Sequence, residues 1–186
     1  MSIDNPIPAG LAERVRLVIF DVDGVLTDAG VYLGEDAGGT AVELKRFDIQ
    51  DGIGLKLLQW SGLDVVIVSG RISQATTIRA RELGIEECYQ EPNADNLRVV
   101  ERVLVEKGVG GDEVAMVGDD IPDLAVMQRV GLKAAVGNAT EPLARIADWQ
   151  ATRRGGHGAA REFCDALLAA RGQLDDAVDR YVAERS

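Results

Sequence analysis

Short apolar runs that stop abruptly at small or charged residues recur along the chain. Four such runs lie at residues 17–20, 65–68, 114–117 and 134–136. Runs of this length that are apolar at successive positions are typical of parallel strands buried on both faces of a sheet. The pattern therefore predicts four buried strands, each followed by a turn of polar or small residues.

Segments with helical periodicity separate these predicted strands. They cover residues 53–60, 73–83, 97–107 and 124–130, and the last ends at Gly131 as a helix C-cap would. Alternating strands and helices predict an α/β fold with a doubly wound parallel sheet. Ligands bind at the carboxyl ends of strands in such sheets, so the polar turns are expected to meet in one cleft.

One segment interrupts the alternation. Two short runs, at 31–33 and 41–45, flank a stretch rich in Gly and acidic residues, which predicts a β-hairpin flap over about residues 30–47. This hairpin is too small to be a cap domain, so another subunit would have to close the cleft.

The chain is predicted to form a single domain of ordinary size, which includes the hairpin. Its expected divisions are an N-terminal extension at 1–15, the domain at 16–172 and a C-terminal tail at 173–186. Gly155-Gly156-His157-Gly158 precedes a helix expected over about 159–171. For the acidic amphipathic tail two alternatives are open: it covers a neighbouring active site, or it is a disordered end.

Composition narrows the class of partner. The net charge of −11 and a pI near 4.6 argue against a nucleic-acid-binding surface, which needs clustered Lys and Arg. Cys88 and Cys164 are far apart and are expected to be buried thiols. No apolar run approaches the roughly 20 residues of a membrane span, and residues 1–12 do not resemble a signal peptide. The cytoplasm is therefore the expected location, with no membrane partner.

Acidic residues follow the first and third predicted strands. Asp21 and Asp23 project near one point, and Asp119 is the natural third contributor to a site for a small hard cation such as Mg²⁺. A carboxylate can also accept a phosphoryl group covalently, so Asp21 would attack and Asp23 would carry the proton. Ser69 and the backbone N–H groups near Gly70 would hold phosphate oxygens. The alternative is that these residues merely form turns.

Three motifs carry a resemblance to a known family. DVDGVLT at 21–27, SGR at 69–71 and GDDIPD at 118–123 resemble motifs one, two and four of the haloacid dehalogenase superfamily of phosphatases. Residues 16–177 more closely resemble the 3-deoxy-D-manno-octulosonate 8-phosphate phosphatases, which are capless homotetramers with a Rossmann-like core. LKRFDIQDGIGLKLL, GRISQATTIRAREL and GGHGAAREFCDALLAARGQLDDA add to that likeness.

The resemblance implies a role for each matching residue. Asp21 would be the nucleophile and Asp23 the acid and base, with Mg²⁺ held by the Asp21 side chain, the Asp23 backbone carbonyl and Asp119. Asp120 and Asp123 would orient this site. The residues implied to contact substrate are Asp23, Asp48, Asp51, Gly52, Lys56, Gly70, Arg71 and Arg79.

Motif three departs from the family pattern. The lysine that steadies the nucleophile and the phosphate in the family aligns with Asn96, which supplies no charge. Three explanations remain open: Arg98 replaces the lysine as a catalytic residue, another cation such as Lys133 compensates, or activity is weakened. The first is preferred. His157 is not expected to act as a base, because the aspartate pair already has that role.

The resemblance implies a Mg²⁺-dependent phosphatase of lipopolysaccharide precursor synthesis that hydrolyses 3-deoxy-D-manno-octulosonate 8-phosphate. A phosphatase for another sugar phosphate, of the nonulosonate 9-phosphate type, is the alternative within the same chemistry. Arg71 argues against it, because such variants often carry an acidic residue there. A catalytically silent homologue is the alternative from another class, and Asn96 is the feature in its favour.

Overall fold

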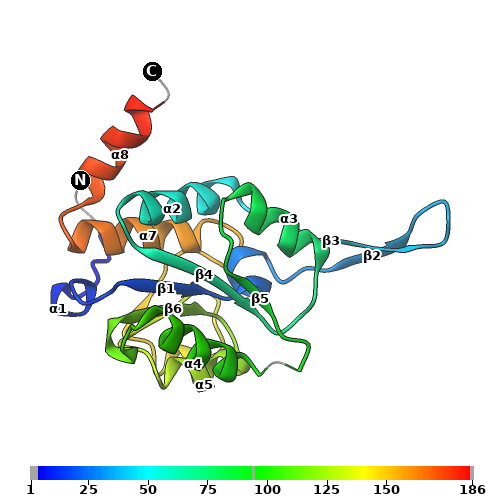
Figure 1. The fold of residues 1–186 in the computed structure, drawn as a ribbon, viewed down its shortest axis with the longest axis horizontal. Helices are drawn as coiled ribbons and strands as arrows, with labels where there is room; N and C mark the ends of the chain where they lie inside the picture. The colour runs from blue at the N-terminus through cyan, green and yellow to red at the C-terminus, as the bar shows by residue number, and fades with distance from the viewer. Residues whose placement is uncertain (1–3, 94, 185–186) are drawn as a thin grey trace.

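The computed structural model describes residues 4–93 and 95–184. Within them, a six-stranded parallel sheet forms the centre of the molecule in the order β5-β4-β1-β6-β7-β8 (Figure 1). The strands are β1 (Leu17–Phe20), β4 (Asp64–Ser69), β5 (Cys88–Gln90), β6 (Val114–Gly118), β7 (Leu132–Ala135) and β8 (Trp149–Gln150). The chain adds β4 and β5 on one side of β1 and then β6, β7 and β8 on the other. The sheet is therefore doubly wound, as predicted, and its switch point lies between β1 and β6.

Helices cover both faces of the sheet (Figure 1). One face carries α2 (Ile49–Trp60), α3 (Gln74–Glu82) and α7 (Ala159–Ala170), and the other carries α4 (Asn96–Lys107) and α5 (Leu124–Met127). Successive strand residues point to opposite faces, so Phe20 packs in one apolar core and Ile19 in the other. The Phe20 ring meets the Phe163 ring of α7 edge to face, with centroids 6.0 Å apart.

Several elements were absent from the sequence prediction. The edge strands β5 and β8 are three and two residues long, too short to show a periodic pattern. The helices α1 (Ala9–Ala12) and α6 (Glu141–Ala144) are single turns. Helix α2 begins four residues earlier than predicted, at Ile49, because the Asp48 side chain accepts a hydrogen bond from the Gln50 N–H at 2.8 Å.

The predicted hairpin is present. Strands β2 (Tyr32–Glu35) and β3 (Ala41–Leu44) pair antiparallel and form a separate two-stranded sheet that extends away from the body (Figure 1). The described residues contain no large cap domain, which agrees with the expected capless architecture.

The two ends of the described chain pack at the far side of the molecule from the hairpin (Figure 1). Arg171 Nη1 donates hydrogen bonds to the carbonyls of Ala12 and Val15, at 2.8 and 2.9 Å. The tail forms α8 (Leu174–Ala183), and Tyr181 stacks beside Trp60 with ring centroids 5.4 Å apart. The division into extension, domain and tail stays a prediction. None of the described helices is long and apolar enough to cross a membrane.

Candidate active site

A cleft of about 200 Å³ opens at the carboxyl edge of the sheet. Its position at the ends of β1, β4 and β6 is the one expected for a ligand site in a doubly wound fold. Half of the described lining residues are aspartates, and Arg71 is the one cation among them. The lining consists of Asp21, Asp23, Ser69, Gly70, Arg71, Asn96, Asp119, Asp120, Pro122 and Asp123.

The turn after β1 brings Asp21 and Asp23 into this cleft. Asp21 continues the pairing of β1 with β6, since its N–H donates to the Val117 carbonyl at 3.1 Å. Gly24 then adopts a φ of 108°, in the left-handed region that favours glycine. A Cβ at Gly24 would lie 2.0 Å from Asp119 Oδ2, so the turn admits the Asp119 carboxylate only because Gly24 has no side chain.

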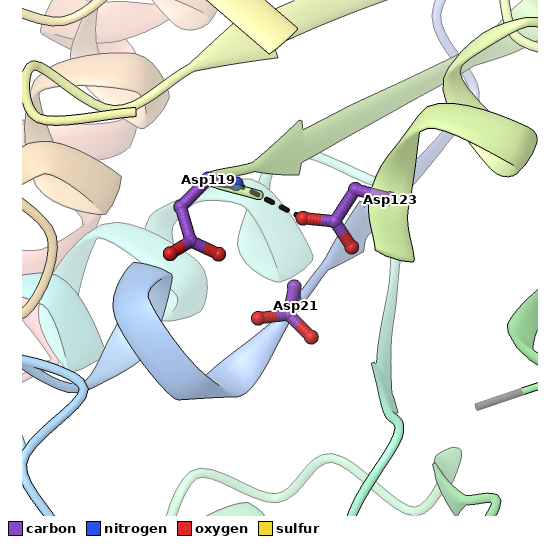
Figure 2. Close-up of side chains that lie close together, drawn as sticks. All are labelled: Asp21, Asp119 and Asp123. Atoms are coloured by element: carbon purple, nitrogen blue, oxygen red, sulfur yellow. Dashed lines mark hydrogen bonds between the residues drawn. The ribbon is translucent and has the colours of Figure 1, made fainter. Parts of the chain in front are cut away.

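Three carboxylates converge between β1 and β6. Asp21, Asp119 and Asp123 lie close together (Figure 2), and each offers an oxygen within 4.8 Å of the others. Asp123 Oδ2 accepts hydrogen bonds from the N–H groups of Asp119 and Asp120, at 2.9 and 3.4 Å. The Asp123 carboxylate therefore orients the backbone that carries Asp119.

This cluster is electrostatically costly in the absence of a cation. Burial, with added repulsion from Asp123 and Asp119, raises the pKa of Asp21 well above its ordinary value. Burial and the nearby Asp123 charge raise the pKa of Asp119 to about 7, and burial raises the pKa of Asp123 to about 6. A divalent cation would offset both the burial of these carboxylates and their mutual repulsion. Oxygen ligands in a small polar site suit Mg²⁺.

Ser69 and Gly70 reach the same cleft from the end of β4. The Ser69 side chain is buried, and its Oγ accepts a hydrogen bond from the Arg71 N–H at 3.2 Å. Helix α3 starts only at Gln74, where Ser73 caps it by accepting from the Thr76 N–H at 3.4 Å. The phosphate position expected from the sequence thus lies on the loop before the helix.

Several predicted substrate contacts lie outside the group that lines the cleft. Asp51 is 2% exposed and accepts hydrogen bonds from the N–H groups of Gly158 and Arg161 at the start of α7, at 3.3 and 2.8 Å. Burial raises the pKa of Asp51 to about 6. Within this chain, Asp51 therefore acts as a cap for α7.

A second group of predicted contacts joins α2 to α3. Lys56 Nζ donates to the Leu83 carbonyl at 3.2 Å, and Arg79 Nη2 donates to the Asp48 carbonyl at 2.9 Å. A Cβ at Gly52 would lie 2.4 Å from Arg79 Nη2, so this glycine makes room for the arginine. Among the described residues, none of these side chains lines the cleft. Their contact with substrate stays a prediction.

Asn96 lines the cleft. Neither Arg98 nor Lys133 is among the lining residues, so neither takes the place of the family's lysine there. Asn96 is 2% exposed, and its Oδ1 has no hydrogen-bond partner among the described residues. The Arg98 side chain is 84% exposed, pairs with Asp95 at 3.0 Å and is not among the residues that line the cleft. Lys133 pairs with Asp148 at 3.3 Å, outside the lining group. The preferred catalytic role for Arg98 gains no support from this placement.

Sequence reasoning missed Lys45 and Glu43. The Lys45 side chain has no exposed surface, and its Nζ lies 2.7 Å from Asp23 Oδ1. Glu43 pairs with Arg71 at 2.7 Å. The signal was present in the alternation over residues 41–45, which places Glu43 and Lys45 on one face and Val42 and Leu44 on the other. His157, by contrast, is exposed and lies outside the lining group.

Similarity to known proteins supports the identification of this cleft as an active site. Residues 91–163 match the haloacid dehalogenase-like hydrolases. The 3-deoxy-D-manno-octulosonate 8-phosphate phosphatase KdsC of Escherichia coli K12 is 40% identical over 166 residues, which cover 89% of this chain and 86% of the relative. The fold and the acidic cleft thus define a hydrolase of the haloacid dehalogenase class. Within it, the chain belongs to the family of 3-deoxy-D-manno-octulosonate 8-phosphate phosphatases.

Solved structures of the family superpose closely. The enzyme from Yersinia pestis has a TM-score of 0.84 at 38% identity and covers 90% of this chain and 88% of its own. The one from Moraxella catarrhalis has a TM-score of 0.85 at 33% identity, with coverage of 93% and 97%. The latter is a complex with magnesium, phosphate and KDO. Together with the acidic cluster, it confirms the prediction of a magnesium enzyme.

Proposed function

We propose that this protein hydrolyses 3-deoxy-D-manno-octulosonate 8-phosphate to the free sugar acid and phosphate. The observation that carries the proposal is the meeting of Asp21, Asp23, Ser69 and Asp119 in one cleft at the switch point of the sheet. The family relatives, which bear this activity in their names, give the substrate.

The proposed reaction has two steps. The Asp21 carboxylate attacks phosphorus, the bond from phosphorus to the sugar oxygen breaks, and Asp23 gives a proton to that oxygen. A water molecule then attacks the aspartyl phosphate while its proton passes to Asp23. The bond from phosphorus to Asp21 breaks, which releases phosphate and restores both carboxyl groups. Ser69 and Gly70 hold the phosphate oxygens.

The donor set fits Mg²⁺. The Asp21 carboxylate, the Asp23 backbone carbonyl and the Asp119 carboxylate would hold the ion, and Gly24 leaves the space that Asp119 needs. When bound, Mg²⁺ supplies the positive charge that screens the repulsion between Asp21 and the anionic phosphate.

A weakened phosphatase is the second candidate, and Asn96 favours it. The buried amide lies where the family's lysine would stand and carries no charge. This candidate predicts the same reaction at a reduced rate.

Phosphate release from 3-deoxy-D-manno-octulosonate 8-phosphate with Mg²⁺ tests the proposal, with Asp21→Asn as the inactive control. We expect turnover by the wild type and its loss in the variant. If the protein hydrolyses only a different sugar phosphate, the proposed substrate is wrong. If it hydrolyses no phosphate ester, the proposed phosphatase activity is wrong.

We propose further that the protein is a cytoplasmic homotetramer. The hairpin exposes Tyr32, Leu33 and Leu44 at 63, 78 and 62%, although a lone two-stranded hairpin is marginally stable in water. At about 200 Å³ the cleft also falls below the roughly 300 Å³ of a usual ligand pocket. Contact with neighbouring subunits would cover the hairpin and complete the cleft.

The two free cysteines accord with the reducing conditions of the proposed cytoplasmic location.

Sedimentation analysis of the double variant Tyr32→Ser/Leu44→Ser tests the tetramer. We expect smaller species than for the wild type. Val105→Ser, which removes an apolar side chain exposed at 82% on α4, is the matched control and should stay tetrameric. A wild type that sediments as a monomer would refute the assembly.

A further inference from the structure

Asp23 forms a closed ring with three other charged side chains. Lys45 Nζ lies 2.7 Å from Asp23 Oδ1, and Arg71 Nε lies 4.0 Å from Asp23 Oδ2. Glu43 closes the ring, at 2.7 Å from Arg71 and 3.9 Å from Lys45. The charges alternate, so the ring is neutral and each anion lies between two cations.

The ring has a buried side and an open side. The Lys45 side chain has no exposed surface and also donates a hydrogen bond to Asp23 Oδ2 at 2.9 Å. The Arg71 side chain is half exposed and lines the cleft. Burying an ammonium group is costly unless it is paired, so Lys45 depends on the two carboxylates as much as they depend on it. The strongest restraint on Asp23 therefore comes from Lys45.

The hairpin delivers two of the four members. Glu43 lies in β3, and Lys45 follows its last residue, Leu44, on the same face as Glu43. The bridge between Thr27 and Phe47 joins the base of the hairpin to the end of the Asp21–Asp23 turn. The hairpin thus enters the active site of its own subunit, in addition to any contact with a neighbour.

We propose that Lys45, supported by Glu43, is a positioning residue that holds Asp23 in the orientation required for proton transfer to the leaving group. The proposal rests on the proposed function, in which Asp23 is the general acid. Such an acid must lie within hydrogen-bond reach of the leaving oxygen, and a carboxylate held by charge on two sides keeps one orientation.

The test compares two leaving groups in Lys45→Met. The alkoxide of a sugar phosphate needs a proton as it leaves, whereas p-nitrophenolate does not. We therefore expect kcat/KM to fall roughly 10- to 100-fold for 3-deoxy-D-manno-octulosonate 8-phosphate and to change little for p-nitrophenyl phosphate. A merely structural role would lower both values alike, so an equal loss, or no loss, overturns the proposal.

Lys107→Met is the matched control. Lys107 is also a poorly exposed lysine, at 18%, and pairs with Glu87 and Asp64 at 2.7 and 3.4 Å. It lies at the end of α4, outside the cleft lining. The ratio of the two kcat/KM values should match that of the wild type.

Glu43→Gln provides a second, milder variant. It removes a charge from the ring and leaves the contact between Lys45 and Asp23 in place. We expect a smaller loss with the same selectivity for the sugar phosphate. If Lys45→Met does not fold, Glu43→Gln decides alone, and an unselective loss overturns the proposal.

A wrong substrate can be distinguished from a wrong role for Lys45. A wild type that hydrolyses another sugar phosphate refutes the substrate only, and that ester then replaces it in the comparison. A wild type without activity on either ester overturns both proposals.

Discussion

Asn96 lies in a cleft rich in negative charge. Its neighbours in the lining include Asp21 and Asp123, whose pKa values are raised by burial. An amide can donate a hydrogen bond to phosphate but does not offset the charge of the nucleophile. A cation at this position would favour both the ionised Asp21 and the phosphate in transfer.

Asn96→Lys is therefore expected to raise kcat. A preorganised charge at the transferring group contributes on the order of 100-fold in other enzymes, so we expect a gain of at least about tenfold. Steady-state phosphate release at saturating Mg²⁺ measures it.

Arg98→Ala is the companion variant, since this arginine is exposed two positions further along α4. Its kcat should equal that of the wild type. A large loss in Arg98→Ala would instead restore the catalytic role predicted from the sequence.

The turn after β1, which carries Asp21 and Asp23, is held in place by elements that are distant in the sequence. Gly155 packs on Gly24, and the Gly156 N–H donates to the Val25 carbonyl at 2.9 Å. The Gly155 N–H in turn donates to Asn138 Oδ1 at 2.9 Å. The loop before α7 thus fixes the backbone that carries Asp23.

Gly155→Ala should disturb this contact. Its Cβ would lie 1.6 Å from the Gly24 carbonyl oxygen, so one of the two backbones must shift. We expect a loss of about 1–3 kcal/mol in the free energy of unfolding, as for other overpacked sites, together with a lower kcat. Urea denaturation and phosphate release measure the two effects.

Gly10→Ala is the matched control, because a Cβ there meets nothing within 4 Å. It should keep the stability and activity of the wild type. Equal behaviour of the two variants would contradict the packing argument.

At the scale of the whole molecule, the acidic cluster links stability to pH and metal. Asp119 has a pKa of about 7 in the folded chain, above the ordinary 3.8. The folded state therefore binds more protons than the unfolded state between about pH 4 and pH 7. Stability is then lost as pH rises through this window.

In chelator, the melting temperature of the wild type relative to Asp119→Asn should therefore fall between pH 5 and pH 8. The variant lacks the titrating carboxyl, so the difference reports the titration of Asp119 together with its repulsion of Asp21. Mg²⁺ should raise the melting temperature of the wild type at pH 8 and raise that of the variant less. Thermal scans with and without Mg²⁺ give both results. A constant difference across the pH range would show that Asp119 is not held at a raised pKa.

Local pattern was sufficient for the centre of the fold. The apolar runs of β1, β4 and β6 predict parallel strands, because strands covered on both faces are apolar at successive positions. Asp21, Ser69 and Asp119 lie at the ends of those runs. Parallel strands end at one edge, so the meeting of these residues follows from the order of elements. The resemblance of the motifs then led to the family.

Side-chain direction and pairing needed the folded molecule. Arg98 and Asn96 lie two positions apart on α4, and packing against the sheet turns Asn96 inward and leaves Arg98 in solvent. Asp51 caps a helix more than 100 residues away, and Lys45 finds Asp23 only because the hairpin folds back onto the first turn. Strand and helix periods act over a few residues, whereas a buried charge is placed by whichever distant group neutralises it.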